Sequence, residues 1–435
     1  MWHYVNLQGQ TLGPVEAVVI IAEVQAGRLV AETLVWYPGW TAWVPVSAAW
    51  QALGMAAPPA RPLPPPPSSL PQAGVAGSAP VVLAPGQNPW SIKGFSDKLV
   101  QLVGMEKLEG FSLKEMMGSV FKRYGPEAIE AYFSVGLKET TPPLEQVSAR
   151  WPQPWMFARA LVLSLVLYFG FVIAMNTFKT TIALPAVIMT GSFAIPIATL
   201  LFFFEMNAPH NVSLYQILKL VLLGGLLSIG ASLLLFDLST FDDWLGPPSA
   251  GLIEEAGKLA AVILLTSRLD PARYPYILNG LLFGAAVGTG FAAFESAGYA
   301  LNITLQAQDI SAGTTNIALR GILSPFGHIV WTAIAAGALW SVKGNQKFQF
   351  GMLLHKRVLT MVGCSMALHF IWNLPFTGPF LIKFWVLGFI AWVLVFATVQ
   401  SGLRQLKAAR KVEHTMVRGI SRADIMAAIK AKEGG

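Results

Sequence analysis

The long apolar runs between residues 155 and 400 constrain this chain more than any other feature. They alternate with short polar breaks and predict eight membrane spans, at 155–175, 181–204, 213–236, 249–267, 276–300, 317–341, 358–376 and 380–400. Each span can cross about 30 Å of hydrocarbon at about 1.5 Å per residue, in some cases with tilt. Only 12% of the 435 residues are charged, whereas soluble domains average roughly a quarter. The sequence therefore predicts an all-α polytopic membrane protein.

The first 55 residues have the pattern of a small α+β domain. "WHYVNLQGQTLGPV" predicts two strands around a turn, "EAVVIIAEVQAGRL" a helix, and "TLVWYPGWTAWVPV" a final aromatic strand pair. The pattern resembles the bacterial GYF-like domain at Trp2, Tyr4, Gly13-Pro14, Gly27, "VW" at 35–36, Gly39 and Trp43. This resemblance implies an aromatic surface for a Pro-rich or other protein ligand. The alternative is that the aromatic residues form the core of the domain.

The rest of the chain divides by composition. A Pro-rich stretch at 56–90, containing "RPLPPPPSSLP", predicts an extended linker. Charge returns at 91–150, which predicts two short amphipathic helices at the membrane surface. Their shared apolar face would contain Leu113, Met117, Val120 and Phe121. The membrane domain follows at 151–400, and a basic cytoplasmic tail occupies 401–435.

Basic residues predict how the chain is oriented in the membrane. They lie at Arg150 and Arg159, at Arg268 and Arg273, between Lys343 and Arg357, and in "RQLKAARK" after the last span. All of them fall on one side if both termini are cytoplasmic, which agrees with the positive-inside rule. We therefore expect a multi-pass protein of the cell membrane with both termini inside. The net charge of +7 then indicates contact with anionic lipid rather than nucleic acid. The first ten residues lack the pattern of a cleavable signal peptide.

Strongly polar side chains occupy one layer of the predicted membrane domain. Span 4 carries Glu254, Glu255 and Lys258, and span 5 carries Glu295. Span 6 carries His328, and span 7 carries His369 and Asn373. Because alternate spans run in opposite directions, all of these residues lie on the order of 5–15 Å below the outer surface. Charged groups at this depth are costly, which makes the layer a candidate functional site.

Helical spacing relates these side chains to one another. Lys258 is four residues from Glu254 and three from Glu255, so it can neutralise one carboxylate on its own helix. Gly284 and Gly288 have GxxxG spacing, which permits close approach of span 5 to its neighbours. Two other groups of polar residues are expected to lie outside the site. Glu205, His210 and His355, at span ends or in loops, are expected to be solvated or interfacial, and Asp242 and Asp243, in an outer loop, are expected to have no chemical role.

The residue types in the layer suit activation of water. A buried carboxylate near a like charge can act as a general base, and a histidine or an asparagine amide can stabilise an oxyanion. Alternatively, a glutamate and two histidines can hold zinc with one open position. No HExxH motif is present, so metal dependence stays open between no cofactor and zinc.

Four motifs in order resemble the PrsW family of intramembrane proteases, which is distantly similar to the CAAX prenyl endopeptidases. They are "EEAGK" at 254–258, "FAAFE" at 291–295, "RGILSPFGHIVWT" at 320–332 and "HFIWN" at 369–373; "FFFEMNAP" at 202–209 is also similar. The resemblance implies cleavage of membrane-associated proteins such as anti-sigma factors. It makes Glu254 or Glu255 the water activator, with Glu295 and His328 beside it. His369 and Asn373 would be the oxyanion donors.

Two other functions compatible with the residues are a non-catalytic membrane scaffold that acts through the N-terminal module, and an ion-coupled carrier. Intramembrane Glu and His residues also serve proton relays. The sequence has no paired inverted repeat and no matched broken helices, which are typical of carriers.

Overall fold

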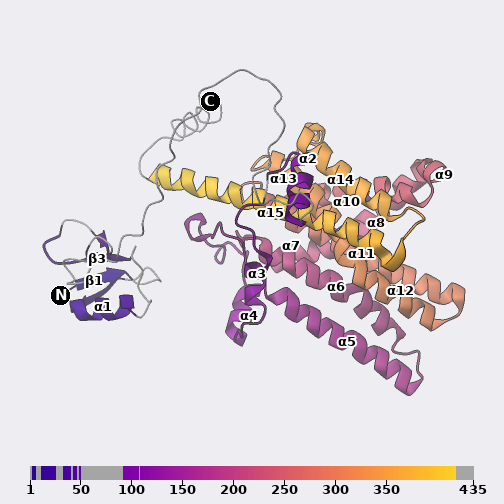
Figure 1. Cartoon of the computed structure of the whole chain (residues 1–435), viewed down its shortest axis with the longest axis horizontal. Helices are drawn as coiled ribbons and strands as arrows, with labels where there is room; N and C mark the ends of the chain where they lie inside the picture. Colours follow the sequence, from indigo (N-terminus) through magenta and orange to yellow (C-terminus); the bar gives the residue numbers. More distant parts are fainter. Residues whose placement is uncertain are drawn as a thin grey trace. The chain divides into compact units, whose positions relative to one another are not determined.

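A computed structural model describes residues 2–5, 11–25, 33–40, 43–46, 49, 92–106 and 108–417. The chain divides into two compact units, Met1–Val82 and Leu83–Gly435 (Figure 1). The predicted linker at 56–90 and residues 418–435 of the predicted basic tail lie outside the described residues.

The N-terminal unit is a small antiparallel sheet with one helix. Its elements are β1 (Trp2–Val5), β2 (Thr11–Val15), α1 (Ala17–Gln25), β3 (Leu34–Trp36) and β4 (Val44–Pro45). The strand order is β2-β1-β3-β4, with Tyr4 opposite Leu12 on one side and Val35 on the other. The predicted α+β domain is confirmed. The aromatic residues of the domain form part of its core and part of its surface: Trp2 is buried in the core, whereas Tyr37 and Trp43 are exposed.

The second unit is helical throughout. Short helices come first: α2 (Ile92–Leu102), α3 (Leu113–Met116), η2 (Met117–Ser119), α4 (Pro126–Phe133) and η3 (Leu144–Gln146). The helices of the first half of the membrane domain are α5 (Met156–Phe178), α6 (Leu184–Met206), α7 (Leu214–Lys219), η4 (Leu220–Gly224), α8 (Gly225–Leu238), α9 (Phe241–Leu245) and η5 (Pro247–Ser249). The second half contains α10 (Ala250–Thr266), α11 (Ile277–Ala307), α12 (Ile310–Leu323), η6 (Ser324–Phe326), α13 (His328–Lys343), η7 (Phe350–Leu354), α14 (Lys356–Trp372), η8 (Pro379–Leu381) and α15 (Ile382–Val417).

Six helical stretches among the described residues are long and apolar enough to cross a membrane. They are Met156–Phe178, Leu184–Met206, Leu214–Leu238, Ile277–Ala307, Ile310–Lys343 and Pro379–Val412. The two other predicted spans form α10 and α14, each of 17 residues. At about 1.5 Å per residue these helices are about 25 Å long, at the lower limit for crossing hydrocarbon. The predicted number of eight spans is therefore approximate.

Helix α11 forms the centre of the membrane bundle, with nearly all of its apolar stretch buried (Figure 1). It packs most extensively against α13. Glycines make this contact possible: a Cβ at Gly284 would lie 2.3 Å from the carbonyl oxygen of Thr332, and one at Gly288 would lie 2.6 Å from that of His328. The GxxxG spacing therefore lies at the contact that positions His328.

The segment before the first span differs from its prediction. Residues 91–150 form three short α-helices instead of two, and Val100 and Met116 join the main core. The predicted apolar face is wrong, since Leu113 and Phe121 are exposed. The reason is local: α3 ends at Met116 and continues as a tight 3₁₀ turn, so the period of 3.6 residues is not maintained.

Glu205 is buried rather than solvated or interfacial, which corrects a second prediction. Its carboxylate accepts backbone N–H bonds from Trp155, Met156 and Phe157, at 2.7, 2.8 and 2.9 Å. These N–H groups lie at the start of α5, where no helical partner exists for them. Glu205 therefore caps a helix that begins about fifty residues earlier in the chain.

Candidate active site

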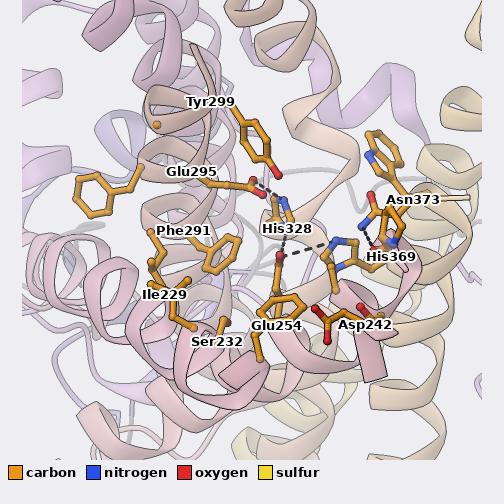
Figure 2. Close-up of a pocket in the computed structure, with 18 of the residues that line it drawn as sticks. Ile229, Ser232, Asp242, Glu254, Phe291, Glu295, Tyr299, His328, His369 and Asn373 are labelled. Atoms are coloured by element: carbon orange, nitrogen blue, oxygen red, sulfur yellow. Dashed lines mark hydrogen bonds and ion pairs between the residues drawn. The ribbon is translucent and has the colours of Figure 1, made fainter. Parts of the chain in front are cut away.

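A cavity of about 770 Å³ lies within the membrane domain, among residues of α8, α10, α11, α13 and α14 (Figure 2). Five of the seven predicted site residues line it: Glu254, Glu295, His328, His369 and Asn373. Residues on four different helices and the residue that ends α14 therefore meet at one place, as the shared depth of the polar layer suggests.

Glu255 and Lys258 lie behind this cavity and do not line it. Their side chains are 1% and 0% exposed, and Lys258 Nζ lies 2.5 Å from Glu255 Oε1. The ammonium also lies 3.7 Å from Glu254 Oε2, 2.7 Å from His328 Nδ1 and 4.3 Å from the centre of the Phe291 ring. Lys258 thus supplies the positive charge that offsets the adjacent carboxylates.

His369 connects the two glutamates. Its Nδ1 lies 3.0 Å from Glu255 Oε1, and its Nε2 lies 3.8 Å from Glu254 Oε2. Trp331 stacks on the imidazole, with ring centres 4.5 Å apart. A neutral imidazole carries one N–H, and Nδ1 needs it to donate to the carboxylate. Nε2 is then an acceptor that faces Glu254, so this arrangement suits a base or a metal ligand rather than the predicted oxyanion donor.

His328 has the first position of α13, directly after the break that η6 introduces between α12 and α13. Its Nε2 lies 3.0 Å from Glu295 Oε2, and its Nδ1 faces Lys258. A neutral His328 also has one N–H donor and one acceptor nitrogen, so its Nε2–H donates to Glu295 and its Nδ1 accepts from the ammonium of Lys258. Glu295 and Lys258 together fix the orientation of this ring.

Arg320 belongs to the site, although the sequence analysis did not select it. It forms an ion pair with Glu295, and its Nε donates to Ser296 Oγ at 2.9 Å. Its guanidinium also lies 4.6 Å from the centre of the Tyr299 ring. An arginine within a membrane span is costly enough to indicate a functional position, and this was the observation that could have identified it.

Asn373 and Asp242 line the cavity from short segments next to α14 and α10. Asn373 is the residue that ends α14, and its Nδ2 donates to the Pro247 carbonyl at 3.3 Å. Asp242 of α9 also lines the cavity (Figure 2). The segment around Asp242, which was predicted to be chemically inert, therefore borders the site.

The residues present fit a divalent ion. Ligand atoms of Glu254, His328 and His369 all lie within 4.8 Å of one another, and two histidines with one glutamate are a common zinc ligand set. Glu254 Oε2 is buried and has no hydrogen-bond partner among the described residues. Glu255 would orient His369 in the way that carboxylates orient metal-bound histidines. His328 Nδ1, however, cannot hold an ion while it accepts from Lys258.

Comparison with known protein families gives two matches that do not overlap. The profile described as GYF domain 2 matches residues 2–49. The profile described as PrsW family intramembrane metalloprotease matches residues 181–399, which is about half of the chain and contains all seven predicted site residues. Searches of curated proteins and of solved structures returned no match. The chain therefore belongs to the PrsW family of intramembrane metalloproteases, with a GYF domain at its N-terminal end.

Proposed function

We propose that this protein is an intramembrane endopeptidase in which Glu254 activates the attacking water. One observation carries the assignment to Glu254 rather than Glu255. Glu254 lines the cavity, whereas Glu255 does not. Each glutamate has one buried oxygen, Oε2, without a hydrogen-bond partner among the described residues, but only that of Glu254 belongs to a residue that faces the cavity. The other oxygen of Glu255, Oε1, contacts Lys258 and His369.

The other side chains position the reacting groups. Glu254 takes a proton from water, the resulting hydroxide attacks the peptide carbonyl, and Glu254 returns the proton to the leaving amine as the C–N bond breaks. The Asn373 amide has a second N–H besides the one donated to Pro247, and this N–H is available to the oxyanion. Glu255 and Lys258 hold His369 and His328 in place, and Arg320 holds Glu295 against His328.

A resident metal is the second form of the proposal. Glu254, His328 and His369 are the residues that would hold it. A bound divalent ion would supply a more acidic water and polarise the peptide carbonyl. The family description supports a metal, whereas the contact between Lys258 and His328 supports a glutamate mechanism.

We further propose, from the resemblance of the motifs, that the substrates are single-span regulatory proteins of the anti-sigma-factor type. We also propose that the protein lies in the cell membrane with both termini on the cytoplasmic side. The N-terminal domain would recruit a Pro-rich or other protein ligand. Tyr37 and Trp43 support this role because they are exposed aromatic residues on a domain whose core is formed by others.

The test is cleavage of tagged single-span proteins by the full-length protein reconstituted in lipid. We expect Glu254→Gln to lower the rate by roughly 100-fold or more, as loss of a general base does. The matched control is Asp243→Asn, which removes a carboxylate from an exposed position of α9 outside the cavity lining. Unchanged cleavage by Glu254→Gln would contradict the proposal, and unchanged biological activity without any cleavage would favour the scaffold function.

Chelation separates the two forms of the mechanism. Wild type that retains its rate after dialysis against chelator operates without a metal. Loss of the rate, with recovery on addition of zinc, shows that the reaction requires a metal. Metal content measured on the purified Glu254→Gln and His369→Ala variants provides a readout that does not depend on activity.

A further inference from the structure

A second cavity, of about 240 Å³, adjoins the candidate active site. It shares three lining residues with the main cavity: Arg320, His328 and Trp372. The two cavities therefore lie on either side of a wall that contains a histidine of the site and the arginine that holds Glu295.

Helix α11 shows how the two cavities are separated. Its residues Phe291 and Glu295 line the main cavity, whereas Ala292 and Ser296 line the second. Residues one position apart in a helix are rotated by about 100°, so the two sets occupy neighbouring faces of the same helix. The Arg320–Ser296 hydrogen bond lies at the boundary between these faces.

The lining of the second cavity combines apolar side chains with unpartnered polar atoms. Leu319, Leu323 and Phe384 supply the apolar part. Asn316 Oδ1 and Trp331 Nε1 are buried without a hydrogen-bond partner among the described residues. One is an acceptor and the other a donor, and buried polar groups are normally paired. A peptide unit offers both partners, since it carries one N–H and one carbonyl.

We propose that this second cavity is a substrate subsite that binds a bulky apolar residue next to the scissile bond. The inference rests on the proposed function, because an endopeptidase cleaves an internal bond and its substrate must extend on both sides of the reacting carbonyl. The main cavity holds one side of the chain. The second cavity holds the other side, with the apolar side chain against Leu319 and Leu323 and the peptide backbone bonded to Asn316 and Trp331.

The first experiment measures which side chain is accepted. A single-span substrate is varied at each position near the cleaved bond through Gly, Ala, Leu and Phe, and products are assigned by mass spectrometry. Leu319 is partly exposed, so Leu319→Trp adds bulk near the cavity with little demand on the core. We expect this variant to cleave the Leu and Phe substrates at least 10-fold more slowly at one position, while the Gly and Ala substrates keep their rate.

Ile322→Trp is the matched control, since Ile322 lies on the same helix, is more exposed than Leu319 and lines neither cavity. It should leave the side-chain preference of wild type unchanged. An equal loss by Leu319→Trp on all four substrates would overturn the proposal and indicate that the cavity supplies water. An unchanged preference would overturn it as well.

A binding measurement separates failure of the subsite from failure of the proposed function. Leu319→Cys is combined with Glu254→Gln and with Cys364→Ser, which removes the natural cysteine, and maleimide labelling is timed with and without the Leu substrate. We expect the substrate to slow labelling at least several-fold. No protection by a substrate that wild type cleaves would overturn the subsite alone. Protection without cleavage by wild type would contradict only the protease function.

Discussion

Lys258 is the side chain on which the buried charges of the site most depend. It is fully buried and contacts Glu255 at 2.5 Å and His328 at 2.7 Å. Lys258→Met removes the positive charge and leaves Glu255 as an uncompensated buried carboxylate. We expect a loss of stability of about 3–5 kcal/mol, typical of a broken buried pair. The half-buried Cys364, the single cysteine of the chain, permits thermal unfolding to be followed with a thiol-reactive dye.

The double variant Glu255→Gln with Lys258→Met is the control for this prediction. Both charges are then absent, so the melting temperature should recover much of what the single variant loses. Equal melting temperatures for wild type and Lys258→Met would show that the pair contributes nothing to stability.

At the scale of single residues, sequence spacing predicted contacts within a helix better than contacts between helices. The spacing of Glu254, Glu255 and Lys258 predicted their ion pairs, which the structure contains. The roles of Arg320 and Glu205 depended on partners on other helices, at Glu295 and at the start of α5. A single sequence shows that such a charge is costly, but it does not show which distant group compensates it.

Helices α11 and α13 are in close contact at Gly288, so a larger residue there should displace one helix from the other. Gly288→Ala places a Cβ 2.6 Å from the carbonyl oxygen of His328, so α13 must shift and carry the imidazole with it. Misplacement of a catalytic group by about 1 Å costs about 100-fold in rate. We expect Gly288→Ala to lower the cleavage rate by about that factor. Gly230→Ala, where an added Cβ meets nothing within 4 Å, should keep its activity.

The loop between α6 and α7 should make stability depend on pH. Burial lowers the pKa of His210, so the unfolded chain binds a proton more readily than the folded one. The stability that His210 contributes is complete above the unfolded pKa of about 6.5 and is lost as pH falls below it. We expect the melting temperature to fall below that pH. His210→Asn tolerates the positive φ of this residue and should reduce the fall; an identical pH profile would contradict the assignment.

Helices were predictable as elements because each needs only one continuous apolar run, and all eight predicted spans are helical. Lengths were less predictable. The apolar runs at 249–267 and 358–376 form helices of only 17 residues, because η5 precedes one and a turn at Asn373 ends the other. The three α-helices in the segment at 91–150 have only 4 to 11 residues. They contain too few turns for the spacing of apolar residues to show where each helix begins and ends.

At the scale of the whole molecule, a labelling experiment can show whether α10 crosses the membrane, because α10 lies between Trp244 and Lys347. With eight crossings, Trp244 and Lys347 lie on opposite sides; with six, they lie on the same side. Both residues are exposed, so Trp244→Cys and Lys347→Cys in a Cys364→Ser background can be labelled with a membrane-impermeant maleimide. We expect opposite sides, because the basic residues between α13 and α14 predict a cytoplasmic loop. Labelling of both from the same side would show that α10 does not cross the membrane, which leaves at most seven crossings.

The charges of the buried cluster have a consequence for inhibitor chemistry. Three carboxyl groups, of Glu254, Glu255 and Glu295, lie beside two cations, of Lys258 and Arg320. With all three carboxyl groups ionised and the histidines neutral, the cluster has one uncompensated negative charge. In a membrane this charge attracts cations strongly. A peptide mimic with a protonated amine at the scissile position should therefore inhibit the metal-free protein. A hydroxamate of the same peptide should inhibit only the zinc-loaded protein. The ratio of the two inhibition constants would then show whether the active site of the working protein is metal-free or zinc-loaded.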